Sequence, residues 1–186
     1  CHMLEACGKI MLVDCGMEQG PDIYENQEIP VDAARIDYVF LTHAHIDHSG
    51  LLPLLYKRGF RGSIFTTYAT WDLCDIMLRD SAHIQMFEAE WRNRKAKRSG
   101  KPEYVPLYTM EDADGVMRLF CGCPYGERIQ ITDGVEIRFT DVGHLLGSAC
   151  IEIWLKEGQE ETKLLFSGDI GNIHQPILKD PRTVDM

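Results

Sequence analysis

Three imidazoles and one carboxylate lie within six residues of this sequence, in the run His43-Ala44-His45-Ile46-Asp47-His48. In an extended backbone the side chains of His43 and His45 project to the same side, so both rings can reach one ion. Where the chain then turns, Asp47 and His48 can face a second ion beside the first. Imidazoles combined with a carboxylate suit zinc, and suit manganese or iron less exclusively. A polar loop of solvent-facing histidines is the alternative, and it explains this spacing less well.

Two later residues of ligand type add to this group. His144 lies in the run Gly143-His144-Leu145-Leu146-Gly147-Ser148, and Asp169 lies in Ser167-Gly168-Asp169-Ile170-Gly171. Each comes just past a predicted strand and is flanked by glycines, which permit tight turns and close backbone approach. Ligands gathered from several strand ends at one edge of a sheet are what a catalytic metal site needs. Taken alone, they would be interpreted as an ordinary buried His and a turn-stabilising Asp.

The elements that must position these residues can be predicted from hydrophobic patterning. Residues 36–42 (IDYVFLT) show little alternation, which indicates a strand covered on both faces. Residues 68–98 lack Gly and Pro and indicate one or two helices, and residues 109–112 (TMED) fit a capping box before a helix to about Phe120. Residues 121–126 are predicted as a loop. The remaining predictions are a helix at 51–58 and strands at 9–14, 63–67, 135–142, 151–155 and 163–166.

This order of elements predicts an α/β or α+β layered domain, and 186 residues suit one domain. The 19 Lys and Arg against 29 Asp and Glu give a formal net charge of −10, which excludes a generally basic nucleic-acid-coating protein but permits a locally positive site. No apolar run approaches the ~20 residues of a membrane span, so no membrane partner is expected. Seven unevenly spaced cysteines do not fit a disulfide framework and favour a reducing, cytoplasmic location.

The motifs resemble the metallo-β-lactamase superfamily, whose signature is HxHxDH followed by a distant His and a distant Asp. The runs HAHIDHSG, GHLLGSA and FSGDIG resemble its β-CASP branch, the RNA-processing and DNA-processing nucleases. The resemblance covers nearly the whole chain, including residues 80–85 (DSAHIQ) of the predicted helix. It implies a metallo-β-lactamase-like αββα sandwich.

The resemblance also implies two divalent ions and their ligands. The matching positions are His43, His45 and His144 for one ion, Asp47 and His48 for the other, and Asp169 as the bridge between them. Asp14 matches a strand-end Asp that orients the ligands from behind them. The resemblance makes Asp47 and Asp169 the catalytic residues. In that scheme a metal-bridging water is acidified toward hydroxide, is oriented by Asp47, and attacks phosphorus in line.

The predicted function is therefore a metal-dependent hydrolase, a phosphodiesterase that cuts RNA, with zinc as the expected metal and single-stranded DNA as an alternative substrate. Other reactions of the same fold stay open, because a fold does not fix a function: hydrolysis of a thioester, a lactone or a sulfate ester. A non-catalytic metal-binding fragment is a further alternative. The sequence leaves the oligomeric state open.

Some parts of the superfamily pattern are not found in this sequence, which ends at Thr183-Val184-Asp185-Met186. The superfamily site has a further His from its C-terminal part, and β-CASP members carry an inserted domain after the region matched here. We therefore expect residues 1–186 to be the N-terminal part of a metallo-β-lactamase-like domain. The β-CASP insert and the C-terminal strands would be absent, the second metal site incomplete, and the general acid missing. His174 is expected to be an exposed loop residue rather than the missing ligand.

A basic run occupies residues 92–101 (RNRKAKRSGK), with six cations and no acid. It could contact a phosphate backbone. The commoner explanation is a charged helix end, because cations suit the last turn of a helix.

Overall fold

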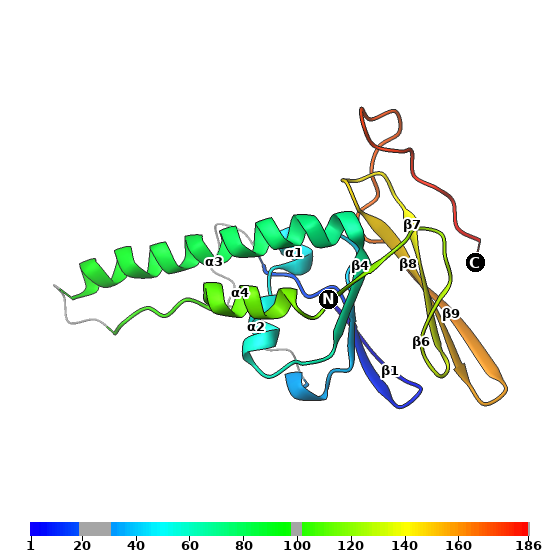
Figure 1. Ribbon diagram of the computed structural model, residues 1–186, viewed down its shortest axis with the longest axis horizontal. Coiled ribbons are helices and arrows are strands. Elements are labelled where there is room, and N and C mark those ends of the chain that lie inside the picture. The colour runs from blue at the N-terminus through cyan, green and yellow to red at the C-terminus, as the bar shows by residue number, and fades with distance from the viewer. Residues whose placement is uncertain (19–30, 98–101, 186) are drawn as a thin grey trace.

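Two β-sheets share one core (Figure 1). The computed structural model describes residues 1–18, 31–97 and 102–185. The first sheet has the order β1 (His2–Ala6), β2 (Lys9–Val13), β3 (Tyr38–Phe40), β4 (Ser63–Thr67) and β5 (Phe120–Cys123). The second has the order β6 (Ile129–Thr132), β7 (Val135–Asp141), β8 (Ala149–Glu157) and β9 (Glu160–Phe166). Strands β2 to β5 run parallel, whereas β1 and the whole second sheet pair antiparallel.

The core between the sheets follows from alternation along the strands. On β7, Val135, Ile137 and Phe139 are fully buried, and the residues between them point away from this core. Met11 of β2 and Phe40 of β3 meet them from the first sheet. The apolar residues of the alternating pattern in residues 135–142 thus form part of the inner face of the second sheet.

Helices cover the other face of the first sheet. They are the 3-10 helix η1 (Ala33–Arg35), α1 (Ile46–Ser49), α2 (Leu52–Lys57), α3 (Tyr68–Ala96) and α4 (Met110–Met117). Leu52 of α2, Leu78 of α3 and Val116 of α4 pack against Leu12 and Val39 of the sheet. This helix–sheet–sheet arrangement confirms the layered α/β prediction. Among the described residues, no helix packs on the outer face of the second sheet, so three layers of the predicted αββα sandwich are present.

The predicted loop at residues 121–126 is partly wrong, because β5 covers Phe120–Cys123 and α4 ends at Met117. Pairing with β4 forms this strand, and such long-range pairing overrides the local loop signal of Gly122. The glycine has a packing role, because a Cβ there would lie 2.4 Å from Cδ1 of Tyr68. Strands β1 and β6 were not predicted.

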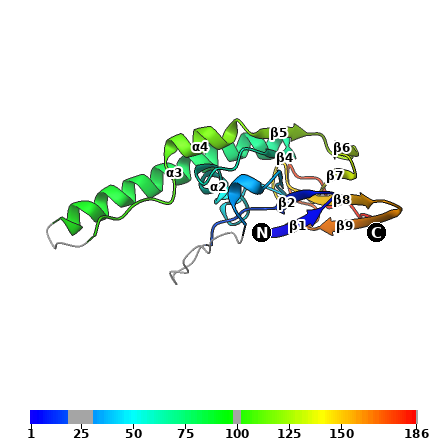
Figure 2. The same cartoon turned by 90° about the horizontal axis from the view of Figure 1, so that it is seen from below.

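Residues 68–96 form one helix rather than two, and this helix extends away from the sheets (Figure 2). Thr67 caps its N-terminus by accepting a hydrogen bond from the Thr70 amide. The capping box predicted at 109–112 is confirmed, with the Thr109 amide donating to Asp112. The predicted helix end at Arg98 lies outside the described residues.

Two expectations from composition concern the environment of the chain. None of the helices in the described ranges is long and apolar enough to cross a membrane. All seven cysteines lie in the described ranges, and none of them forms a disulfide there.

Glu152 is a fully buried carboxylate on the outer side of the second sheet. Nε and Nη2 of Arg138 donate to its two oxygens at 2.6 and 2.7 Å, and Nζ of Lys163 lies 2.8 Å from Oε1. Burial alone would raise the pKa of Glu152, but the hydrogen bonds from Arg138 and Lys163 outweigh burial and hold that pKa below its ordinary value. The three groups tie β7, β8 and β9 together.

Replacing this carboxylate should weaken the second sheet in a pH-dependent way. We expect Glu152→Gln to lower the free energy of unfolding by about 1–3 kcal/mol at pH 7, in the range of hydrogen bonds to charged groups. Because the folded pKa is depressed, this stabilisation is present above the unfolded pKa of about 4.3 and is lost as the pH falls through the folded pKa. Urea unfolding at pH 7 and at acidic pH measures the difference.

Glu136→Gln is the matched control, because the Glu136–Arg128 pair is exposed and should contribute at most about 1 kcal/mol. Equal losses from the two substitutions would contradict a special contribution of the buried carboxylate.

Candidate metal centre

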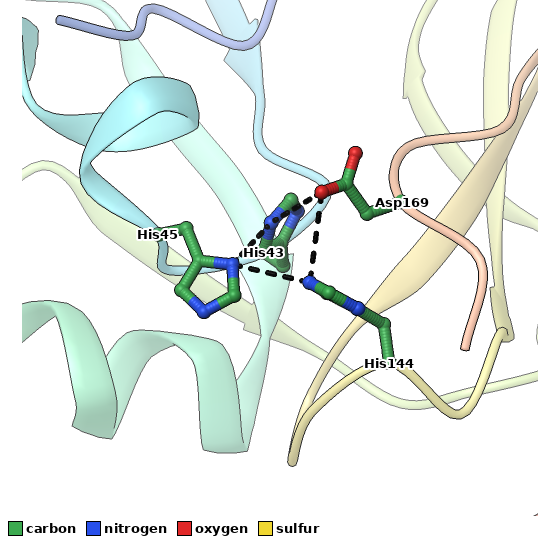
Figure 3. Close-up of side chains that lie close together, drawn as sticks. All are labelled: His43, His45, His144 and Asp169. Carbon is green, nitrogen blue, oxygen red and sulfur yellow. Dashed lines mark hydrogen bonds and ion pairs between the residues drawn. The ribbon is translucent and has the colours of Figure 1, made fainter. Parts of the chain in front are cut away.

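Four strands deliver the predicted site residues to one region of the fold. Asp14 follows β2, and His43 and His45 lie between β3 and α1. His144 follows β7, and Asp169 follows β9. Figure 3 shows His43 and His45 from the first sheet facing His144 and Asp169 from the second.

Four of these side chains converge on one point. His43, His45, His144 and Asp169 each offer a ligand atom, and these atoms all lie within 4.8 Å of one another. Nδ1 of His45 lies 3.1 Å from Nε2 of His43 and 3.1 Å from Nε2 of His144. Oδ2 of Asp169 lies 3.9 Å from Nε2 of His43 and 3.6 Å from Nε2 of His144.

A second group begins on the other side of Asp169. Its Oδ1 lies 3.4 Å from Nε2 of His48, and Oδ2 of Asp47 lies 4.0 Å from the same nitrogen. Asp169 therefore directs one oxygen toward each group of imidazoles. The Asp47 side chain is 63% exposed and stands at the open side of the centre.

Asp14 supports both groups from behind. Its Oδ1 accepts a hydrogen bond from the Thr42 amide at 2.8 Å. Its Oδ2 accepts hydrogen bonds from Oγ1 of Thr42 at 2.9 Å and from Nδ1 of His48 at 2.8 Å. The residue is buried and has a φ of +59°, a region that L side chains rarely adopt. This backbone turn at the end of β2 directs the carboxylate toward the end of β3.

These bonds assign the proton positions on two imidazoles. A carboxylate only accepts, so Thr42 donates its hydroxyl proton to Asp14 and accepts from Nδ1 of His43, 3.0 Å away. Nε2 of neutral His43 is then an unprotonated lone pair directed at the cluster. His48 likewise donates through Nδ1 to Asp14 and turns Nε2 toward Asp169.

The two imidazoles differ in proton affinity. Burial lowers the pKa of His43 to about 4, and the neighbouring His48 and His45 add to this effect. The hydrogen bond to Asp14 raises the pKa of His48, and burial only partly offsets it. His43 is thus neutral near pH 7, whereas the hydrogen bond to Asp14 favours the protonated form of His48.

Glycine permits the close backbone packing around the centre at two positions. A Cβ at Gly16 would lie 1.5 Å from the carbonyl oxygen of Asp47. A Cβ at Gly171 would lie 1.9 Å from the carbonyl oxygen of Gly143. A side chain at Gly16 would therefore displace helix α1, which carries Asp47, and one at Gly171 would displace the loop that carries His144.

The loop that carries His144 is held by three further bonds. Oγ of Ser148 accepts the amides of His144 and Leu145 at 3.0 and 3.1 Å. Oγ1 of Thr67, at the start of α3, donates to the Gly147 carbonyl at 2.6 Å. The N-terminus of α3 therefore lies against this loop.

Four of the six predicted ligand positions form one cluster, His48 and Asp47 lie next to it beyond Asp169, and Asp14 lies behind His48. His174 is 83% exposed and pairs with Asp180, away from the cluster, which agrees with the expectation of a loop residue. Sequence reasoning missed Thr42 and Ser148. Both stand beside the motifs, Thr42 directly before His43, but hydroxyl residues there are also compatible with a strand end and a turn.

The chemistry of the donor set suits a divalent ion. Three imidazole nitrogens and a carboxylate oxygen at one point form a nitrogen and oxygen ligand set of the kind that zinc accepts. Without a cation, at least one 3.1 Å nitrogen–nitrogen contact would bring polar atoms together with little benefit, since Nδ1 of His45 carries at most one proton. The residues present therefore fit a divalent metal ion.

This two-sheet fold, with a cluster of metal-ligand side chains at its strand ends, is that of a domain suited to metal binding. Residues 1–60 match the model of the metallo-β-lactamase superfamily. The chain is 34% identical over 181 residues to ribonuclease TTHA0252 of Thermus thermophilus, which covers 97% of the chain and 37% of the ribonuclease. It is 31% identical over 176 residues to transcription termination factor FttA of Cenarchaeum symbiosum, covering 91% of the chain and 25% of that factor. By these matches the chain is similar to the metallo-β-lactamase superfamily, with residues 1–60 matching the family model itself.

Solved structures support the fold. A metallo-β-lactamase of Cronobacter sakazakii matches with a TM-score of 0.55 at 17% identity, over 94% of this chain and 57% of the enzyme. A subclass B3 metallo-β-lactamase of Bradyrhizobium japonicum matches with a TM-score of 0.52 at 14% identity, over 96% of this chain and 59% of the enzyme. The chain spans about a third of the length of the ribonuclease and a quarter of that of the termination factor. Superfamily and cluster together indicate divalent metal binding.

Loss of the Asp14 carboxylate should weaken metal binding without removing a ligand. In Asp14→Asn the amide nitrogen cannot accept a hydrogen bond, so the three hydrogen bonds from Thr42 and His48 cannot all be kept. We expect a loss of metal affinity of about 10–100-fold, which is usual for partners that orient ligands. Competition with a chromophoric chelator measures it. The exposed Asp180→Asn is the control, and an unchanged affinity in Asp14→Asn would contradict the assigned role.

Proposed function

We propose that this chain forms the metal-binding core of a metal-dependent ribonuclease that hydrolyses phosphodiester bonds of RNA. The observation that carries the proposal is the position of Asp169, with Oδ2 toward His43 and His144 and Oδ1 toward His48. Two ions about one bridging carboxylate suit phosphodiester hydrolysis, since both the attacking and the leaving oxygen need stabilisation. The names of the two relatives, a ribonuclease and a transcription termination factor, support RNA as the substrate.

The proposal assigns the ligands as predicted from the motifs. One ion is held by His43, His45 and His144, the other by Asp47 and His48, with Asp169 between them. Zinc is the metal we propose, because imidazole ligands outnumber carboxylates, with manganese and iron as alternatives. A cytoplasmic location is part of the proposal, because seven unevenly spaced cysteines do not fit a disulfide framework.

Charge explains why an acidic chain can take a polyanion here. Two divalent ions would exceed the charge of the Asp47 and Asp169 carboxylates, so the centre would be locally positive in a chain of net charge −10. Bound there, divalent ions supply an acidified water and stabilise negative charge on the phosphate.

The residues of the chain have separate tasks in this reaction. Asp47, exposed at the open side, is placed to accept a proton from the attacking water and to orient it. Asp14 has no access to substrate and keeps the rings of His43 and His48 oriented. Because these orientations exist before any ligand is bound, little reorganisation is needed during the reaction.

Cleavage assays test the reaction class. We expect the metal-loaded protein to cleave labelled single-stranded RNA, more slowly as residues 1–186 alone than in a longer chain that supplies the general acid. His45→Ala and Asp169→Asn should lower the rate by more than about 100-fold, since even the partners of ligands cost 10–100-fold. His174→Ala is the matched control, because this exposed histidine lies outside the cluster. Single-stranded DNA, a thioester, a lactone and a sulfate ester are offered in parallel. Turnover of a small ester without RNA cleavage would overturn the proposal, and so would metal binding without any turnover.

Metal counting tests the bridging role of Asp169. At a saturating free metal concentration we expect up to two ions per wild-type chain, the second bound more weakly because its ligand set is incomplete. We expect one ion per chain in His48→Ala, and less than one in Asp169→Asn because both sites lose a ligand. Elemental analysis after equilibrium dialysis against a fixed free metal concentration gives the numbers, with His174→Ala again as control. If Asp169→Asn kept one tightly bound ion and His48→Ala lost both, the assignment of the bridge would be wrong.

A further inference from the structure

Helix α3 has two apolar faces, and only one of them is buried. Cys74, Leu78 and Ala82 are fully buried against the body of the protein. On the opposite side, Ile84, Phe87 and Trp91 are 49%, 58% and 49% exposed. A surface helix normally carries a single apolar stripe, so a second one marks a surface for a partner. We call these three residues the distal stripe.

The spacing of the distal stripe is that of a coiled-coil seam. Exposed residues recur in alternating steps of four and three, in the order Asp80, Ile84, Phe87, Trp91 and Arg94. Side chains at these steps lie in one row along a helix and can insert between the side chains of a second helix. Residues 102–109, which precede α4, are called the return segment. Tyr104 of this segment is hydrogen-bonded to Asn93 on the other side of the helix, so the described residues leave the row uncovered.

Charge along the same row selects the orientation of the partner. Asp80 lies at the end near the body, and Arg94 and Lys95 lie at the far end. An antiparallel second α3 would place Ile84 opposite Phe87 of the second copy. Asp80 would then lie opposite Trp91 of that copy, one turn from its two cations. The same contacts recur on both sides of a two-fold axis, as an isologous dimer requires.

We propose that the distal stripe is a self-complementary dimer surface, on which the α3 helices of two copies of this chain pack antiparallel. The surface suits protein better than nucleic acid. Two of the cations beside it are engaged within the chain: Nζ of Lys95 lies 3.5 Å from the centre of the Trp91 ring, and Arg92 pairs with Glu88 at 3.4 Å. Asp80 and Glu88 border the apolar row and would repel phosphate.

The arrangement has a consequence for the candidate metal centres. Each α3 begins beside the loop that carries His144, through the bond from Thr67 to Gly147. Antiparallel pairing centred between Ile84 and Phe87 places the two helix N-termini about 50 Å apart at a rise of 1.5 Å per residue. The two centres would lie at opposite ends of the paired helices, each open to its own substrate.

Sedimentation equilibrium over a range of concentrations tests the dimer. We expect a saturating mass of twice the 21.2 kDa of the chain. Phe87→Asp should raise the dissociation constant by more than about 30-fold, as expected for a central aromatic anchor. Val105→Asp is the matched control, because Val105 is 70% exposed on the return segment and lies outside the stripe. Circular dichroism and the melting temperature check that both variants fold.

A charge exchange tests the antiparallel orientation. Asp80→Arg and Arg94→Asp should each weaken dimerisation, and the double variant should restore it. A monomer at all concentrations would overturn the proposal, as would self-association that Phe87→Asp leaves unchanged or that grows without saturation. RNA binding by a monomeric chain that is lost in Trp91→Ala would identify the stripe as a nucleic-acid surface instead. None of these readouts depends on hydrolytic activity.

Discussion

The candidate centre depends on one buried carboxylate, that of Asp14. Its oxygens accept hydrogen bonds from the backbone and hydroxyl of Thr42 and from His48, so one group ties the end of β2 to the segment after β3 and to α1. A non-glycine residue at positive φ persists only where surrounding bonds hold it, and these three bonds do so. Through them Asp14 orients His43 by way of Thr42 and His48 directly, one imidazole in each group.

The second constraint is that the two sheets must end at the same level. Asp169 and His144 follow strands of the second sheet, whereas the other ligand-type residues lie in the segment after β3 and in α1, on the side of the first sheet. The Ala149 amide donates to the Thr42 carbonyl at 2.9 Å, and the Gly171 amide donates to the Val142 carbonyl at 2.9 Å. The first bond joins the sheets, and the second joins the two loops of the second sheet. Geometry at the centre therefore depends on the packing of the inter-sheet core as well as on the ligands themselves.

Which residues meet at the centre could be predicted from the sequence, because their types, their spacing and their positions after strands are local signals. The ligand roles remain proposals. Elements that depend on long-range pairing could not be predicted: β5 exists because β4 pairs with it, and its Gly122 signalled a loop. The role of Thr42 was hidden for a similar reason, since its two partners are brought together only by the fold. The features that local sequence patterns did not predict are thus those that depend on tertiary contacts.

The two ends of helix α3 differ in charge and in what they contact. Its N-terminus holds the His144 loop, where bound ions would make a positive centre. Its middle carries Asp80 and Glu88, and its far end carries Arg92, Arg94, Lys95 and Lys97. A polyanion leaving the centre along this helix would first meet carboxylates, so the basic end does not form a continuous track with the centre. An exposed apolar row with opposite charges at its two ends is complemented better by an antiparallel copy of the same row than by a polyanion. The surface for association is then separate from the surface for substrate.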